Sequence, residues 1–418
     1  MNTSILAEII TIGDEILYGQ ITDTNTRFIS AELDKIGIKT IRKSSVGDQK
    51  EKILEILKEA ESRANVIIMT GGLGPTKDDI TKHTLAEYFN CELKLNQEAL
   101  ADVTQFFIQI GRELTETNRS QAFLPENCTF ISNKFGTAPA MWFENNGKIF
   151  VSLPGVPKEM EGLMKTEILQ RLKSFFNTPI FYHKFIRTIG IGESYLADKI
   201  TDWEDELPSH IKLAYLPSSG QVRLRLTASG DDEEKLKMDV ETEINKLLPL
   251  ISENVYGFNN EEIESAIGKL LIEKGKTLSI AESCTGGYTS HLITKVVGCS
   301  KYYAGSVVAY DNKIKISALG VSTDTINQYG AVSEETVKEM AEGIRKKFGT
   351  DIGIADTGIA GPDGGTDEKP VGTVWLAYAD GEKTIAKKVQ FLRQRELNIN
   401  LTSNALLNML RLILIEKR

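Results

Sequence analysis

Ser283 stands where an acyl-transfer nucleophile would be favoured. It follows a short apolar run, residues 277–281, and precedes a helical pattern that begins after Gly286 and Gly287. Backbone N–H groups at a helix N-terminus stabilise negative charge, such as the charge that develops on a carbonyl oxygen under attack. The two glycines let the backbone approach a substrate closely. The same stretch is equally suited to capping a helix, because serine and threonine are common N-terminal caps.

Tyr310 and Lys315 supply the partners that such a serine needs. A strand expected over residues 304–309 ends at Tyr310, and the helix that follows it carries Lys315. A lysine that burial or a nearby cation keeps neutral can take the proton of Ser283, so serine, tyrosine and lysine form a workable amidase set without histidine. The structural alternative makes Tyr310 an edge residue of a sheet and Lys315 one of many solvated lysines.

A glycine-dense segment, residues 356–366, follows another expected strand, residues 351–355. Successive backbone N–H groups in such a segment can form a nest for an anion, although a mobile loop has the same composition. The carboxyl ends of parallel strands meet at one edge of a sheet. We therefore expect this segment, Ser283 and Lys315 to lie around one site.

The first third of the chain contains a phosphate-binding signal. A β-branched strand, residues 66–69, runs into a glycine-rich turn, residues 70–79, which precedes a helix. Glycines at a strand end expose backbone donors, and the helix N-terminus behind them favours phosphate. The segment matches neither the P-loop nor the dinucleotide fingerprint, and a capped glycine-rich turn is the structural alternative. The glycines concerned are Gly71, Gly72 and Gly74, with Gly155 in a further turn that follows a strand.

Carboxylates accompany this turn. Asp78 and Asp79 lie within it, and Asp14 and Glu15 follow the first expected strand, residues 7–12. In a parallel sheet both strand ends face one crevice, where four carboxylates around a phosphate would repel one another without a cation. Oxygen ligands of this kind suit Mg²⁺, Mn²⁺ or Co²⁺. We therefore predict a divalent-metal site with Asp14, Asp78 and Asp79 as its ligands.

Three blocks carry these segments. In residues 1–172 and 257–418, strands alternate with helical patterns, which predicts sheets covered by helices. Residues 180–250 differ, with an alternating strand at 222–227 and a charged helix at 232–248. The predicted fold class is α/β, with two separate three-layer domains joined by a small α+β module. Further expected elements are helices at 25–36, 50–62 and 261–273, strands at 184–189 and 373–379, and a hairpin turn at Asp380-Gly381.

Composition narrows the classes of function. The chain has 418 residues, of which 41% are apolar and 26% charged, as in ordinary globular proteins of two to four domains. A net charge of −9 argues against general nucleic-acid binding. No apolar stretch is long enough to span a membrane, and the start of the chain lacks a secretory signal pattern. Four scattered cysteines and four histidines indicate neither disulfides nor a zinc site. We expect a cytoplasmic protein.

The ordered combination of motifs resembles the CinA family of competence/damage-inducible proteins over nearly the whole chain. The motifs are residues 70–76 with Asp78 and Asp79, residues 281–287, and residues 358–362. The resemblance implies an N-terminal molybdopterin-binding-type domain that hydrolyses ADP-ribose to AMP and ribose 5-phosphate with a divalent metal. It implies a C-terminal amidase that converts nicotinamide mononucleotide to nicotinic acid mononucleotide and ammonia without a cofactor. A KH-like middle module and a homodimer are implied as well.

The resemblance also assigns roles in the amidase. Ser283 corresponds to the nucleophile, Lys315 to its base, and Tyr310 to a proton relay or orienting group. Backbone N–H groups of residues 284–287 would hold the oxyanion. Cys284 lies at a helix start, where a thiolate is stabilised, but the family match favours Ser283 as the nucleophile.

Arg395 matches the arginine of a family pattern that usually reads Phe-x-Gly-Asp-Arg, and we expect it to contact the nucleotide phosphate. Arg393 and Gln394 replace the usual Gly-Asp in this chain. The expected substrate-contacting residues are Thr285, Gly286, Gly287, Gly358, Ala360, Gly361 and Arg395 in the C-terminal domain, and Gly71, Gly72, Gly74, Thr76 and Gly155 in the N-terminal domain.

Two alternatives stay open. The protein could be a nucleotide- or pterin-binding sensor in which one or both sites bind without turnover. Alternatively, only the amidase is active and the N-terminal domain has a regulatory or dimerising role. The middle block lacks a Gly-x-x-Gly loop, so RNA binding does not follow from its KH-like character. The expected partners are small-molecule nucleotides and a second copy of the chain, not nucleic acid or a membrane.

Overall fold

The computed structural model describes residues 5–76, 79–391 and 394–416. The predicted metal ligand Asp78 and the unusual Arg393 lie outside the described residues.

The chain divides into two compact units. The first extends to Tyr182 and includes Ser229–Leu236, and the second contains His183–Ala228 and the residues from Lys237 onward. None of the described helices is both long and apolar enough to cross a bilayer.

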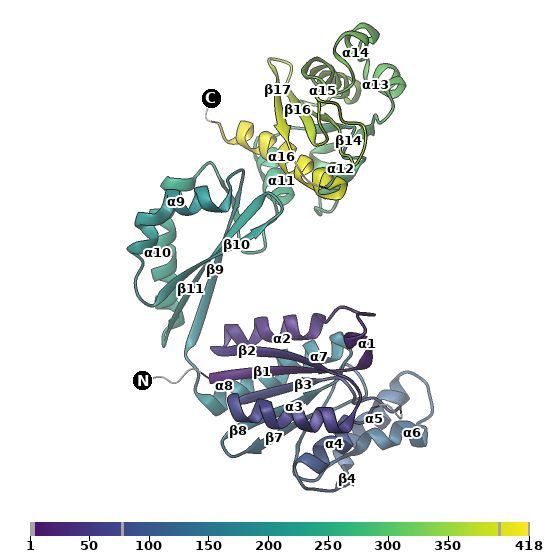
Figure 1. The fold of residues 1–418 in the computed structure, drawn as a ribbon, viewed down its shortest axis with the longest axis vertical. Coiled ribbons are helices and arrows are strands. Elements are labelled where there is room, and N and C mark those ends of the chain that lie inside the picture. The colour runs from purple at the N-terminus through teal and green to yellow at the C-terminus, as the bar shows by residue number, and fades with distance from the viewer. Residues whose placement is uncertain (1–4, 77–78, 392–393, 417–418) are drawn as a thin grey trace. The chain divides into compact units, whose positions relative to one another are not determined.

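A six-stranded sheet forms the centre of the first unit, in the order β2-β1-β3-β8-β7-β6 (Figure 1). Its parallel strands are β1 (Ile5–Ile12), β2 (Ile38–Val46), β3 (Val66–Thr70) and β8 (Lys148–Leu153). The antiparallel part is β7 (Ala140–Asn145), paired with β8 and with β6 (Thr129–Ile131). The turn between β7 and β8 is Asn146-Gly147, whose φ angles of 50° and 74° suit a type I′ hairpin.

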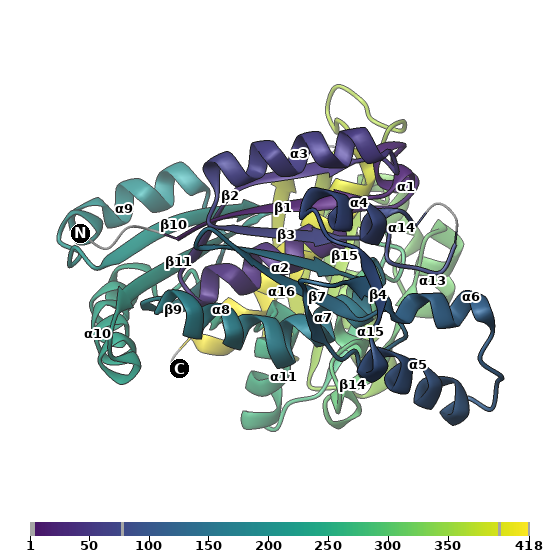
Figure 2. The ribbon, with the colours of Figure 1, turned by 90° about the horizontal axis from the view of Figure 1, so that it is seen from below.

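Helices cover both faces of this sheet (Figures 1 and 2). Along β1 the side chains alternate between two cores, with Ile9 in one and Ile10 in the other. The core of Ile9 includes α2 (Thr24–Lys35), α7 (Pro157–Leu163), the π-helical turn η2 (Met164–Ile168) and α8 (Leu169–Phe176). The core of Ile10 includes α3 (Lys50–Arg63), α4 (Thr81–Tyr88) and α5 (Gln97–Gln109). Smaller elements are α1 (Asp14–Leu17), β4 (Leu93–Leu95), α6 (Glu116–Arg119), η1 (Ser120–Ala122) and β5 (Phe123–Pro125).

The middle of the chain forms a four-stranded sheet in the order β10-β11-β9-β12. Its elements are β9 (Ile180–Ile189), α9 (Glu193–Asp205), β10 (Ile211–Ser218), β11 (Gln221–Gly230), α10 (Glu233–Ile251) and β12 (Val255–Phe258). Alternate residues of β11, including Leu224 and Leu226, are fully buried, as the alternation of its sequence predicts. This is the predicted small α+β module.

A five-stranded sheet forms the centre of the C-terminal domain, in the order β14-β13-β15-β16-β17. Its strands are β13 (Leu278–Glu282), β14 (Tyr303–Val308), β15 (Ile352–Gly358), β16 (Thr373–Ala379) and β17 (Thr384–Gln390). β13, β14 and β15 are parallel, and β16 and β17 pair antiparallel across the predicted turn at Asp380-Gly381. The carboxyl ends of the parallel strands therefore meet at one edge.

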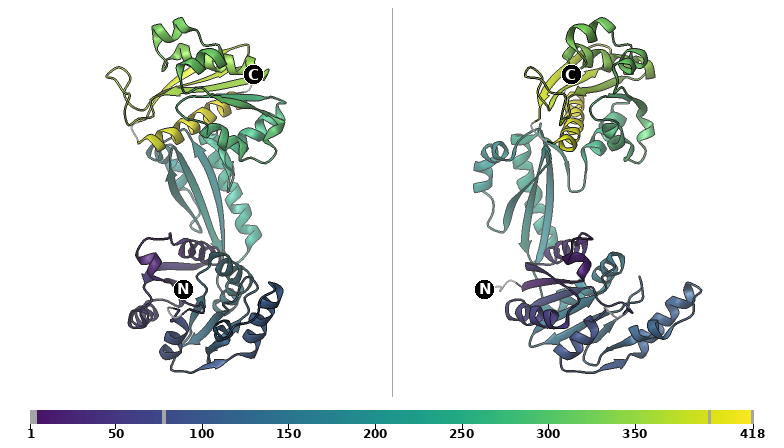
Figure 3. Two further views of the ribbon diagram at one scale, coloured as in Figure 1. Left: turned by 90° about the vertical axis from the view of Figure 1, so that its right-hand side faces the viewer. Right: turned by 45° about the vertical axis from the view of Figure 1, so that its right-hand side comes forward.

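Helices again lie on both faces of this sheet, and Figure 3 shows the long yellow helix α16 opposite the green helices. On one face are α11 (Ile263–Glu273), α12 (Tyr288–Thr294) and α16 (Arg395–Ile415). On the other are α13 (Asn312–Leu319), α14 (Thr323–Tyr329) and α15 (Glu334–Phe348). A 3₁₀ turn, η3 (Cys299–Lys301), precedes β14. The predicted fold class, two three-layer α/β domains joined by an α+β module, is confirmed.

Gly343 allows α13 to approach α15 closely. A Cβ atom at this helical position would lie 1.8 Å from the carbonyl oxygen of Leu319, the last residue of α13. Backbone cannot yield as a flexible side chain does, so any larger residue must move α13. The same helix carries Lys315, so Gly343 contributes to the position of that side chain.

We expect Gly343→Ala to lower the free energy of unfolding by about 2 kcal/mol or more, because overpacking against backbone outweighs the helix propensity of alanine. Urea unfolding measures this. Gly192→Ala is the control, since its Cβ would meet its nearest heavy atom, in Tyr195, at 3.6 Å. Equal stability of the two variants would contradict the close approach of α13 to α15 at Gly343.

Candidate active sites

Ser283 and Lys315 lie together in the C-terminal domain. Ser283 directly follows β13, and the Nζ of Lys315 on α13 lies 3.1 Å from the Ser283 Oγ. The same Nζ donates to the carbonyl oxygens of Ala309, at 2.6 Å, and Tyr310, at 3.3 Å. Lys315 is only 1% exposed, and burial lowers its pKa. It is therefore not the solvated lysine of the structural alternative.

Glu282 caps the helix that follows the serine. Its side chain is fully buried and accepts hydrogen bonds from the backbone N–H groups of Gly287, at 2.9 Å, Thr289, at 3.1 Å, and Ser290, at 2.9 Å. Three N–H groups at the start of α12 are thus bound by one carboxylate. The capping role that the sequence offered to the serine and threonine belongs to Glu282, which leaves Ser283 free.

Asp356 holds the turn that carries the serine. Its fully buried carboxylate, on β15, accepts from the backbone N–H groups of Ser283 and Thr285, each at 3.2 Å. The Cys284 thiol donates to the same oxygen at 3.2 Å. Burial first, and the charge of Glu282 second, raise the pKa of Asp356 to about 6.

The hydroxyl of Thr285 joins the two carboxylates. It lies 2.7 Å from Oε2 of Glu282 and 2.6 Å from Oδ2 of Asp356. One hydroxyl proton serves only one of these oxygens, so both short contacts require a second proton in the network. Burial raises the pKa of Asp356 to about 6, so its carboxyl can hold this proton below about pH 6.

Cys284 is not accessible as a nucleophile. Its side chain is 5% exposed, and burial raises the pKa of its thiol well above the ordinary value. The neighbouring N–H groups of Thr285, Gly286 and Gly287 bind Asp356, the Ser283 carbonyl and Glu282. Among the described residues 284–287, the N–H of Cys284 is the one that no other residue binds, and it faces its own thiol.

Tyr310 and Arg395 meet at the surface of this site. The Tyr310 side chain is 60% exposed, and its hydroxyl accepts from Nη2 of Arg395 at 2.9 Å. Arg395 also donates to the carbonyl oxygen of Gly361 at 2.6 Å, and Ala360 accepts from Asn398 at 2.9 Å. Tyr310 thus contacts Lys315 through its carbonyl oxygen, while its hydroxyl points to Arg395. The structure brings Tyr310, Lys315 and Arg395 together.

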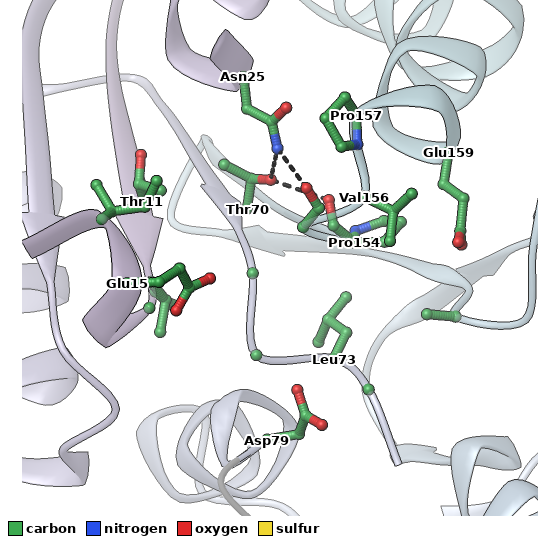
Figure 4. Close-up of a pocket in the computed structure, with 18 of the residues that line it drawn as sticks. Thr11, Glu15, Asn25, Thr70, Leu73, Asp79, Pro154, Val156, Pro157 and Glu159 are labelled. Atoms are coloured by element: carbon green, nitrogen blue, oxygen red, sulfur yellow. Dashed lines mark hydrogen bonds between the residues drawn. The ribbon is translucent and has the colours of Figure 1, made fainter. Parts of the chain in front are cut away.

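A second candidate site is a cavity of about 630 Å³ at the carboxyl ends of β1, β3 and β8 (Figure 4). Of the predicted residues, Gly71, Gly72, Gly74 and Gly155 line it. Asn25 connects two segments that line the cavity. Its side chain donates to the Thr70 Oγ1 at 3.0 Å and to the Gly155 carbonyl oxygen at 2.8 Å. We call this space the main cavity.

Gly71 shows why glycine is needed at this edge. Its φ is 115°, and a Cβ atom there would lie 2.0 Å from the carbonyl oxygen of Ile12. The turn after β3 therefore passes directly over the end of β1, which keeps the two strand ends close together.

The lining of the main cavity is acidic. Among its described lining residues there are five carboxylates and neither lysine nor arginine. The carboxylates belong to Glu15, Asp23, Asp48, Asp79 and Glu159. Asp14 is not among the lining residues, and its backbone N–H binds the Asp48 carboxylate at 3.1 Å. Burial raises the pKa of Glu159.

No group of three His, Cys, Asp or Glu side chains among the described residues forms a ready metal cluster. Mg²⁺ commonly uses one or two carboxylates together with water and substrate phosphates, so the oxygen donors of this cavity still fit such an ion. Asp79 is partly committed, because it accepts from the Thr76 N–H at 2.9 Å and from the Thr76 hydroxyl. Of the predicted pair Asp14-Glu15, Glu15 is the residue that lines the cavity, as Asp79 does (Figure 4).

Comparison with known proteins covers the whole chain. The family models that match are a probable molybdopterin binding domain at residues 8–174, the damage-inducible protein CinA KH domain at 183–257 and the CinA C-terminal domain at 260–414. A CinA-like protein of Cytophaga hutchinsonii is 54% identical over 411 residues, 98% of either chain. The chain belongs to the CinA family. A second CinA-like protein, of Flavobacterium psychrophilum, is 46% identical over 406 residues, 97% of either chain.

Solved structures of CinA proteins match shorter parts of the chain. The crystal structure of the protein CinA from Thermoplasma acidophilum is 34% identical, with a TM-score of 0.38, and the match covers 42% of this chain and 99% of that one.

In this CinA-family chain, sequence reasoning did not assign roles to Glu282 and Asp356. Both are acidic residues at strand ends beside a predicted nucleophile, which was a usable signal. Their pairing depends on the register of β13 and β15, in which Ala281 lies opposite Ala355. The residues that follow this pair are Glu282 and Asp356, so the sheet itself places the two carboxylates side by side.

We expect Asp356→Asn to change how stability depends on pH. Because the pKa of Asp356 is raised from 3.8 to about 6, folding favours its protonated form. Its stabilising contribution is complete below about pH 4 and is lost as the pH rises through 6. Between pH 5 and 7 the wild type should lose about 1 kcal/mol more than Asp356→Asn, which cannot titrate.

Urea unfolding of both proteins at pH 5, 6 and 7 measures the difference in slope. Parallel curves for the wild type and Asp356→Asn would show that Asp356 does not hold a proton in the folded state.

Proposed function

We propose that the C-terminal domain is a nicotinamide mononucleotide amidase and that the N-terminal domain hydrolyses ADP-ribose. The observation that carries the first activity is the 3.1 Å contact between the Ser283 Oγ and the buried Nζ of Lys315. Family membership supports the assignment, and the acidic main cavity supports a metal-dependent nucleotide site in the other domain. We expect the protein to act as a cytoplasmic homodimer.

In the amidase reaction, neutral Lys315 takes the proton of Ser283, whose Oγ attacks the carboxamide carbon. The N–H of Cys284 donates to the oxyanion that forms. The C–N bond then breaks, and ammonia leaves with the proton from Lys315. Water then gives a proton to Lys315 while its oxygen attacks the ester carbon. The bond to the Ser283 Oγ breaks, Ser283 takes the proton back from Lys315, and nicotinic acid mononucleotide is released.

The nucleotide itself assists this chemistry. Its pyridinium ring is cationic and disfavours the charged form of a nearby lysine, which adds to the effect of burial on Lys315. The guanidinium of Arg395, held by Tyr310 and Gly361, is available at the mouth of the site for the phosphate.

We expect Ser283→Ala and Lys315→Met each to lower kcat/KM for ammonia release from nicotinamide mononucleotide by at least about 10³-fold. In the wild type the activity should rise with pH as Lys315 loses its proton, at a lower pH than for an ordinary lysine, because its pKa is lowered. Cys284→Ala is the control and should retain activity within a few-fold. Unchanged ammonia release by Ser283→Ala would refute the nucleophile.

In the N-terminal domain, Glu15 and Asp79 would hold the divalent cation, which would neutralise the diphosphate of ADP-ribose and polarise its phosphorus. The glycine turns at Gly71 and Gly155 would let the backbone approach that diphosphate. Asn25 keeps these two turns together.

We expect Glu15→Gln to lower metal-dependent AMP release from ADP-ribose by about 100-fold, because it removes a charged oxygen donor. Asp14→Asn is the matched control, since Asp14 does not line the main cavity, and it should keep most of the activity. If Asp14→Asn loses the activity and Glu15→Gln keeps it, Asp14 is the metal ligand, as the sequence predicts.

A sensor that binds a nucleotide or pterin without turnover is the second candidate for the N-terminal domain. The observation that favours it is the lack of a ready three-ligand metal cluster among the described residues. Saturable ADP-ribose binding without AMP release, with Mg²⁺, Mn²⁺ and Co²⁺ each present, would establish the sensor.

A further inference from the structure

A smaller cavity adjoins the main cavity of the first unit. It has a volume of about 260 Å³, below the roughly 300–1,000 Å³ of a complete small-molecule site, so it suits one part of a ligand. Gly74, Pro75 and Asp79 line both cavities, which places the glycine-rich turn between them. We call this space the side cavity. Its other lining residues are Thr76, Lys82, His83, Leu93, Ser120 and Phe123.

Lys82 gives the side cavity a positive charge at neutral pH, since burial lowers its pKa only to about 8. Of the described lining residues of the two cavities, it is the only lysine or arginine. Its side chain is 7% exposed, and its Nζ donates to the Ser120 carbonyl oxygen at 3.1 Å. An ammonium group has three N–H donors, so this bond leaves donors for a further acceptor. A neutral glutamine could bind a carbonyl equally well, whereas a buried charge is costly unless it has an anionic partner.

The carboxylate nearest in sequence to Lys82, that of Asp79, already accepts hydrogen bonds from Thr76. Asp79 lies three residues before Lys82, ahead of α4, and its Oδ2 accepts from the N–H and hydroxyl of Thr76. Asp79 therefore offsets part of the charge of Lys82 without forming an ion pair with it. A phosphate on Gly74-Pro75 would meet Lys82 on one side and the carboxylates of the main cavity, with their cation, on the other.

Phe123 gives the side cavity an aromatic wall. It belongs to β5, and its side chain is 40% exposed although it is large and apolar. Leu93, on the strand paired with β5, adds apolar surface, and the exposed His83 adds a second planar ring. Aromatic side chains at the edge of a cationic pocket are typical of sites that stack a nucleobase.

We propose that the side cavity binds the nucleoside monophosphate end of the ligand whose other end occupies the main cavity. Phe123 stacks on the base, and Lys82 donates to the phosphate that lies over Gly74-Pro75. This inference deepens the proposed nucleotide function of the N-terminal domain, because it names the part of the ligand that each cavity takes. It requires binding there but not turnover.

Isothermal titration with AMP tests the proposal, with adenosine and ribose 5-phosphate as partial probes. Lys82→Met should weaken AMP binding by about 10- to 100-fold and leave adenosine unchanged, because a charge-assisted hydrogen bond is lost. Phe123→Leu should weaken AMP and adenosine by about 5- to 50-fold and leave ribose 5-phosphate unchanged. Lys94→Met is the control, since Lys94 is exposed, pairs with Glu126 and does not line the side cavity.

The outcomes distinguish AMP binding in the side cavity from hydrolysis of ADP-ribose. If the wild type does not bind AMP, or if Lys82→Met and Phe123→Leu bind it as the wild type does, the proposal is overturned. Phe123 is partly exposed, so Phe123→Leu remains decisive even if Lys82→Met fails to fold. If AMP binding behaves as expected but the wild type does not hydrolyse ADP-ribose, the side cavity stands and the proposed hydrolysis fails.

Discussion

The C-terminal site depends on two buried carboxylates that bind the backbone of one turn. Asp356 accepts from the N–H groups on either side of Cys284, and Glu282 accepts from the first N–H groups of α12. Without these acceptors the turn would leave several buried donors unpaired, each at a cost of about 1–3 kcal/mol. The carboxylates therefore fix the direction of the Ser283 side chain before any substrate arrives.

The same interactions support the proposed role of Lys315 as the base. Lys315 is held by two carbonyl oxygens and by Ser283, in a site from which water is largely excluded. Burial disfavours its charge, whereas the nearby Asp356 favours it. A proton on Asp356 reduces that opposing effect, so the state of the carboxylate network influences how easily Lys315 becomes neutral. In the proposed amidase, holding the turn and activating the serine are therefore coupled through Asp356.

The main cavity of the N-terminal domain has an excess of negative charge, in contrast to the buried lysine of the C-terminal site. Its described lining residues present five carboxylates to a ligand that, on our proposal, carries a diphosphate. Backbone turns can approach phosphate closely but cannot cancel this charge, which is why our proposal places a divalent cation there. Lys82 lies just beyond the glycine-rich turn and provides the positive charge that the main cavity lacks. On our proposals, charge divides the site into two parts, one that would hold a metal ion and one that would hold a nucleoside phosphate.

The sequence by itself determined strands such as β1, β3, β13 and β15, helices such as α2, α3 and α11, the glycine turns and the family, because periodicity, turn residues and ordered motifs are local properties of the chain. It also named Ser283 and Lys315, since both follow strands of one parallel sheet. It did not determine which residues pair across that sheet. The register of β13 and β15 places Glu282 beside Asp356, and the packing of α16 brings Arg395 to the Tyr310 hydroxyl. At the start of α1, Glu15 lines the main cavity and Asp14 does not. Contacts between distant residues depend on tertiary packing, and only the folded structure specifies them.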